Sequence, residues 1–265
     1  IAYDFISRWI KSKQVIFINS KKIVEKCIEI VINFVIIAGF ILFNTGDFIK
    51  SIPLSARDKL CVADIMIDSY AGLRGNICLF ALIFINIYKD IKYDFMYTKL
   101  YIVGSRVKMY YNQIIKSLVN SFMYSITYIY ISYSMSKLYI NTLINWSSQE
   151  SYYFKVTQSI VTVYFMSIII EMFLSVFLLL QIVQTLYIVL SWIVNIEAVK
   201  WIAVLLIIFF STSVLKIPIF VNISLKQYSI GNVIVNIVIS FILLMMLIIS
   251  GVWISKRKQY YRPKR

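Results

Sequence analysis

The sequence predicts an all-α, polytopic integral membrane protein with six transmembrane helices, an amphipathic helix before the first of them, and both termini in the cytoplasm. Hydrophobic residues make up 60% of the 265 residues and charged residues only 15%, whereas soluble domains contain about 45–50% and about 25%. The apolar residues form long runs, and the basic residues lie between these runs and at both ends. Since a soluble surface needs more polar cover than this composition supplies, we expect a single membrane domain.

Residues 1–26 are expected to form a cytoplasmic helix that lies in the membrane interface. Phe5, Ile6, Trp9 and Ile10 recur at the spacing of one helical face, and polar and basic residues take the other face. A basic amphipathic helix that carries tryptophan is suited to this position. A disordered basic tail is the alternative, because the pattern covers only about two turns. The segment lacks the pattern of a signal peptide.

A helix needs about 20 mostly apolar residues to cross a bilayer. Six windows, all within residues 27–254, are candidates for such helices. They are residues 27–44, 70–88, 117–135, a window within 159–194, 201–215 and 232–254. The fourth window is longer than one crossing needs. We prefer one long helix to a hairpin that turns near Gln181 and Gln184, because an extra crossing would place the two basic ends on opposite sides of the membrane.

The distribution of basic residues predicts the orientation. Most of the 27 lysines and arginines lie on one side of the six-helix arrangement, in residues 1–26, 89–116, 195–200 and 255–265. Because Lys and Arg accumulate in cytoplasmic segments, we expect this side, with both termini and the basic tail at 255–265, to face the cytoplasm.

The first outer loop, residues 45–75, is balanced in charge. Its stretch "LCVADIMIDSYAGL" is interpreted as a short helix on the outer surface, with a solvated face.

The sequence lacks the residues that several classes of protein need for their chemistry. There is no histidine, and Cys27, Cys61 and Cys78 are not spaced as a metal-binding or redox pair. An intramembrane protease or lipid transferase would need paired nucleophiles, acids or metal ligands, so no enzymatic activity, metal or cofactor is expected of this chain. The sequence lacks the phosphate-binding motif GxxxxGK[ST]. Although the formal net charge is +15, no compact basic fold is evident, and nucleic-acid binding is not expected.

Residues 89–116 have the pattern of a helix, a break and a second helix that leads into the third window. One face of the first helix carries Tyr93, Met96, Tyr97, Leu100 and Tyr101. Glycine permits the bend that a break needs, and the break at Gly104 and Ser105 is followed at once by Arg106 and Lys108. Tyrosine and methionine are enriched at protein interfaces, so a docking segment is predicted. The alternative is an interfacial helix that only anchors the third span.

In this position, "TKLYIVGSRVKMYYNQIIKSLVNSF" resembles the cytoplasmic segment of bacterial type-two ABC exporter permeases, above all the small permeases of peptide-export, bacteriocin or lantibiotic-immunity gene clusters. The resemblance implies that residues 1–26 are an elbow helix, and that residues 93–108 are a coupling helix that docks on a separate ATP-binding subunit. ATP and Mg would then be held by that partner. The resemblance also implies a pair of ATP-binding subunits and a second permease subunit, which is either another copy of this chain or a related permease. It further implies a location in the bacterial cytoplasmic membrane and a peptide or other amphipathic, antimicrobial cargo.

Three polar residues within the fourth window are candidate intramembrane contacts. Glu171 is the charged residue deepest in an apolar run, and such residues are functional candidates because their insertion costs about 2.5–3.5 kcal/mol. It either contacts a cationic peptide or a second subunit, or lies near the outer interface if the span begins late. Gln181 and Gln184 are one turn apart and are expected to pair across helices.

A stand-alone secondary transporter, or a membrane-anchored immunity or interaction protein without an ATPase partner, is the alternative function. Secondary transporters favour internal repeats and spans broken by Gly or Pro. The chain has only 7 Gly and 3 Pro, and the prolines lie outside the predicted spans. The subunit of an ABC exporter is therefore the preferred interpretation.

Overall fold

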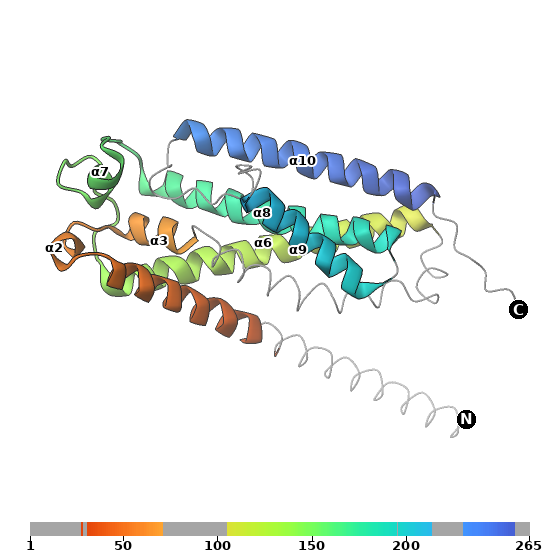
Figure 1. Cartoon of the computed structure of the whole chain (residues 1–265), viewed down its shortest axis with the longest axis horizontal. Coiled ribbons are helices and arrows are strands. Elements are labelled where there is room, and N and C mark those ends of the chain that lie inside the picture. The colour runs from red at the N-terminus through yellow and green to blue at the C-terminus, as the bar shows by residue number, and fades with distance from the viewer. Residues whose placement is uncertain (1–27, 29–30, 71–104, 195, 214–229, 258–265) are drawn as a thin grey trace, which may run out of the picture.

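The structure is a computed structural model that describes residues 28, 31–70, 105–194, 196–213 and 230–257. All regular elements in these ranges are α-helices. A helix over Val31–Ser51 is followed by the helices labelled in Figure 1, which are α2 (Leu54–Arg57), α3 (Val62–Tyr70), α6 (Arg106–Tyr139), α7 (Tyr152–Thr157), α8 (Phe165–Ile193), α9 (Glu197–Ser213) and α10 (Ile230–Arg257).

The long helices run back and forth along the longest axis of the molecule (Figure 1). The start of α6, the end of α8 and the end of α10 lie together at one end, which we call the basic end. The end of α6 and the start of α8 lie at the opposite end beside α2, α3 and α7. We call α2, α3, α7 and the connecting residues 140–164 the cap.

The fourth apolar window forms one helix, as preferred from the sequence. α8 is continuous from Phe165 to Ile193, through both Gln181 and Gln184. Its 29 residues contain neither glycine nor proline, so no residue interrupts the helical hydrogen bonds. At 1.5 Å per residue the helix is about 44 Å long, which exceeds the roughly 30 Å hydrocarbon core of a bilayer.

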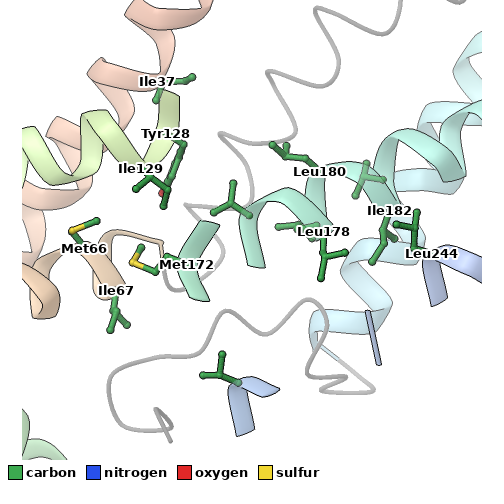
Figure 2. Close-up of a cluster of buried hydrophobic side chains, with 14 of the residues drawn as sticks. Ile37, Met66, Ile67, Tyr128, Ile129, Met172, Leu178, Leu180, Ile182 and Leu244 are labelled. Atoms are coloured by element: carbon green, nitrogen blue, oxygen red, sulfur yellow. The ribbon is translucent and has the colours of Figure 1, made fainter. Parts of the chain in front are cut away.

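α8 is the central helix of the described bundle, since it contacts α6, α10, α9 and α3. Most of its second half is buried, from Leu178 to Trp192. Aliphatic and aromatic side chains fill the spaces between these helices, and their close packing stabilises the bundle. Figure 2 shows part of this cluster, in which Met66 of α3, Ile129 of α6 and Met172 of α8 lie close together.

The prediction of a solvated helix in the first outer loop is wrong in one respect. α3 is a short helix, as expected, but residues 61–67 are almost fully buried. It packs against α6 and α8, because its apolar residues occur on all sides over this stretch and must be covered by the bundle.

Two predicted boundaries also differ. The first helix continues to Ser51 instead of ending near Asn44. Glu197 and Lys200 lie in the first turn of α9 rather than in a connecting turn, because that helix begins before the apolar run that marked it in the sequence.

Helix α6 has an inverted distribution of polarity. Its buried polar residues are Gln113, Ser117, Ser121, Ser125, Ser132 and Ser136. Its exposed side carries large apolar residues, among them Ile115, Leu118, Val119, Phe122, Met123, Ile126 and Tyr130. A helix on the surface of a soluble protein has the opposite arrangement.

Three helices in the described ranges are long and apolar enough to cross a membrane, namely Val31–Ser51, Phe165–Ile193 and Asn232–Arg257. They correspond to the first, fourth and sixth predicted spans. The structure therefore supports an all-helical chain with membrane-spanning character. The second predicted span, residues 70–88, lies almost wholly outside the described residues.

Candidate functional site

The structure describes part of the predicted functional residues. Ser105, Arg106 and Lys108 of the coupling segment are described, as are the three intramembrane candidates. The remaining coupling residues, Tyr93, Met96, Tyr97, Leu100, Tyr101 and Gly104, lie outside the described residues. The interfacial residues Phe5, Ile6, Trp9 and Ile10 also lie outside them.

Helix α6 begins directly after the predicted break. Ser105 has an extended backbone and Arg106 is the first helical residue, so the second helix of the predicted pattern is present. The backbone N–H of Met109 donates a 3.0 Å hydrogen bond to the carbonyl of Ser105. From this point α6 continues without interruption to Tyr139, at the cap.

Just after this start, α6 contacts two other long helices, α8 and α10. The hydroxyl of Tyr110 donates to the carbonyl of Ile248 in α10 over 3.3 Å, and its ring contacts Trp192 of α8 edge-on at 6.4 Å between centroids. The indole N–H of Trp192 donates to Oε1 of Gln113 over 2.9 Å. We call Tyr110, Gln113, Trp192 and the α10 turn at Ile248 the interlock.

The sequence analysis missed the interlock. Tyr110 and Trp192 lie near the ends of apolar runs, where membrane-interface aromatic residues also occur, but both are completely buried. Gln113 was not singled out either. Gln113 and Gly251 lie near the ends of apolar runs in the sequence. Such positions do not indicate which helices contact one another.

Farther along α6, serine hydroxyl groups form hydrogen bonds with Gln181 of α8. The Nε2 group of Gln181 donates to Ser117 Oγ over 3.0 Å and to Thr185 Oγ1 over 3.4 Å. Its Oε1 accepts from Ser121 Oγ over 2.9 Å. We call Ser117, Ser121 and Ser125 of α6, together with Gln181, Gln184 and Thr185 of α8, the polar seam. Gln181 thus connects α8 to α6 inside the bundle.

Gln184 has a different environment from Gln181. Both side chains are 1% exposed, but among the described residues neither amide atom of Gln184 has a hydrogen-bond partner. In the interlock, Nε2 of Gln113 is also buried without a partner in the ranges that the structure describes. Each unpaired buried amide costs free energy, about 1–3 kcal/mol, and such groups in a native structure call for an explanation.

Glu171 lies about 9 Å along α8 from its first residue, at 1.5 Å per residue. It is half-buried and takes part in a polar interaction. Because α8 begins at Phe165, Glu171 lies toward the cap.

At the cap, a second polar site joins two segments distant in sequence. Asp64 of α3 is fully buried. Its Oδ1 accepts from the indole N–H of Trp146 over 2.7 Å, and its Oδ2 accepts from the backbone N–H of Cys61 over 3.0 Å. Trp146 stacks on Tyr153 with a centroid distance of 4.3 Å. Backbone bonds from Val62 to Thr142 and from Tyr152 to Lys59 close the same contact.

Burial changes the acid–base properties of the cap. It raises the pKa of Asp64 to about 6, although the N–H groups of Cys61 and Trp146 act in the opposite direction. Burial also raises the pKa of Asp68 to about 6 and raises that of the Cys61 thiol. The pKa of Tyr152 rises through burial and through the nearby charges of Asp68 and Asp64. Within the described ranges, no group of three or more His, Cys, Asp and Glu side chains is placed to hold a metal ion.

No protein-family model, no curated protein and no solved structure matches this chain. The resemblance to ABC exporter permeases therefore remains a prediction from the sequence.

Proposed function

We propose that this chain is the membrane-spanning permease subunit of a bacterial ABC exporter. It crosses the cytoplasmic membrane several times and exports a peptide or another amphipathic, antimicrobial cargo. ATP hydrolysis is supplied by a separate subunit that holds ATP and Mg and docks at the basic end. A second copy of the chain, or a related permease, completes the transporter.

The inverted polarity of α6 is the observation that carries the membrane part of this proposal. Five of its serines are buried, two of them in hydrogen bonds with Gln181 of α8, whereas large apolar side chains are exposed over most of its length. In water this arrangement would leave a large apolar surface uncovered. In a bilayer the apolar side contacts lipid, and the serines hydrogen-bond within the bundle. α6 is thus proposed as a further span, although it is less apolar than the three clear ones.

The charges at the two ends support the proposed orientation. At the basic end the described basic residues are Arg106, Lys108, Lys116, Lys200, Lys256 and Arg257, against the acid Glu197. At the cap end the basic residues Lys50, Arg57, Lys59, Lys137 and Lys155 are balanced by Asp47, Asp58, Asp64, Asp68 and Glu150, and Glu171 also lies toward this end. The excess of positive charge favours a cytoplasmic basic end.

The position of the interlock supports the docking part of the proposal. The predicted coupling segment, residues 93–108, leads directly into α6, and Tyr110 lies within the first two turns of that helix. Hydrogen bonds connect these turns to α8 and α10. A force applied by a partner at the start of α6 would therefore act on three long helices together.

The experiment is a pull-down of the tagged, full-length protein in mild detergent from the bacterium that encodes it, followed by mass spectrometry. We expect an ATP-binding subunit in stoichiometric amount. Tyr97→Asp combined with Leu100→Asp should abolish its recovery, and Gly104→Val should reduce it, while membrane insertion is unchanged.

The matched control places the same two substitutions at the other end of the molecule. Leu54 and Tyr164 are 76% and 85% exposed at the cap, and Leu54→Asp with Tyr164→Asp should leave recovery unchanged. If no ATP-binding subunit accompanies the wild-type protein, the exporter proposal fails. A stand-alone transporter, or an immunity or interaction protein, would then take its place.

A further inference from the structure

We propose that α8 has a second register on α6, shifted toward the cap by one helical turn, in which Gln184 takes the place that Gln181 occupies in this structure. This movement adds a conformational step inside the chain to the proposed transport function. It concerns the bundle alone, so its test requires neither the ATP-binding subunit nor a cargo.

The first observation is the contrast between two glutamines of the same helix. Gln181 makes hydrogen bonds with Ser117, Ser121 and Thr185. Gln184 is equally buried and makes none within the described part of the chain. A leucine or methionine at position 184 would fill the same space without leaving a buried amide unpaired. The amide is thus unfavourable in this register, which suggests that it has partners in another.

The second observation is that the partner groups repeat at the spacing of the glutamines. Ser117, Ser121 and Ser125 follow one another at intervals of four residues, so they lie on one face of α6, one turn apart. All three are buried. Gln181 occupies the interval between Ser117 and Ser121, and Gln184 follows it by about one turn of α8.

The two helices run in opposite directions (Figure 1), which determines the outcome of a shift. If α8 moves toward the cap by one turn, about 5.4 Å, Gln184 reaches the interval between Ser117 and Ser121. Gln181 then reaches the interval between Ser121 and Ser125. Both amides would be paired in this register. One-turn shifts between packed elements are a known type of conformational transition.

Ser125 is placed to serve as a partner in the second register. Its hydroxyl donates only within its own helix here, to the carbonyl of Ser121 over 2.7 Å. A rotation of the side chain would allow it to bond Gln181. Ser136 makes the same kind of bond, to the carbonyl of Ser132 over 2.8 Å, but faces no glutamine of the seam, and so provides a control.

The test measures distances between α6 and α8 by double electron–electron resonance in the purified full-length chain in nanodiscs. Cysteines for nitroxide labels replace exposed residues, in a background where Cys27, Cys61 and Cys78 are substituted. One label pair is Ile115 with Ile170, and the other is Leu138 with Ile193; these four residues are 59%, 54%, 76% and 56% exposed. A shift toward the cap lengthens the first distance and shortens the second, each by about 5 Å.

The expected result follows from the two sets of partners. Gln181→Met removes every contact of Gln181 but leaves Gln184 able to bond Ser117 and Ser121, so the shifted distances should predominate. Gln184→Met should keep the original distances. Adding Gln184→Met to Gln181→Met should restore them, because no amide is left to favour the shift.

Substitutions in the serines provide the controls. Ser125→Ala should leave the shifted population of Gln181→Met unchanged, since the glutamine that would bond Ser125 is absent there and Gln184 keeps its two serines, whereas Ser121→Ala should reduce it. Ser136→Ala should change neither distance. If Gln181→Met, or Gln181→Leu should the first variant not fold, gives the same two distances as the wild type, the second register does not exist.

Discussion

Asp64 illustrates how one residue is stabilised inside the cap. A buried carboxylate is costly unless it is hydrogen-bonded, and Asp64 accepts one bond on each oxygen, from Trp146 and from Cys61. These bonds join α3 to the segment before α7. The raised pKa shows that burial still outweighs the two bonds.

At the residue scale, we predict that acidification stabilises the cap. The pKa values of Asp64 and Asp68 are about 6 in the folded chain, against an ordinary value of 3.8. The folded state therefore binds protons more tightly than the unfolded state, and the stabilisation is complete below about pH 4 and lost as the pH rises through 6. Thermal unfolding of the purified chain in detergent should occur at a higher temperature at pH 5 than at pH 7.5.

Amide substitutions assign this effect to the two carboxyls. Asp68→Asn should reduce the gain between pH 7.5 and pH 5, because one of the two titrating groups is removed. Glu150→Gln, which changes an exposed carboxyl in the same cap, should leave it unchanged. An equal pH dependence in Asp68→Asn and wild type would contradict the prediction.

At the scale of the helices, the contact between α6 and α10 depends on one glycine. The ring and hydroxyl of Tyr110 lie directly over Gly251, so that a Cβ atom at position 251 would overlap with both. The same tyrosine donates to Ile248, one turn earlier in α10. Gly251 therefore allows the close approach that the interlock requires.

Gly251→Ala should lower the free energy of unfolding by about 1–3 kcal/mol, the usual cost of overpacking, and should separate α10 from α6. Thermal unfolding in detergent measures this loss. Tyr110→Ala in the same chain should recover part of it, because the overlapping ring is then absent.

Gly39→Ala is the matched control in another helix. Nothing lies within 4 Å of a Cβ atom at Gly39, and alanine is favoured over glycine within a helix by about 1 kcal/mol. This variant should therefore be more stable than the wild type. A comparable loss of stability in Gly39→Ala and Gly251→Ala would show that the overlap with Tyr110 is not the cause.

At the scale of the whole molecule, the proposed orientation in the membrane makes a prediction that chemical labelling can check. Single cysteines at Leu54 and Tyr164 of the cap should react with a membrane-impermeant maleimide on intact cells, because the cap faces outward. Cysteines at Ser105 and Arg257 should react only after the membrane is permeabilised. All four positions are exposed in the structure. Labelling of Ser105→Cys in intact cells would place the basic end outside the cell.

The sequence by itself determined the helical class and the location of most long helices. Apolar runs placed α9 and α10 within a few residues, because helix formation depends on local spacing and on the absence of Gly and Pro. The single helix α8 was preferred over a hairpin because an extra crossing would place the two basic ends on opposite sides of the membrane. α6 begins well before its apolar window, at Arg106. The start of a helix directly after Ser105 was also predicted, and the structure places the first residue of α6 at Arg106.

Only the tertiary structure decided which side chains meet. The burial of Asp64, the contact of Tyr110 with Gly251, and the difference between Gln181 and Gln184 depend on how distant segments pack. Nothing in a local pattern distinguishes two glutamines one turn apart on the same helix. Whether a buried amide is paired depends on the register of the neighbouring helix, and this register results from the packing of the whole bundle.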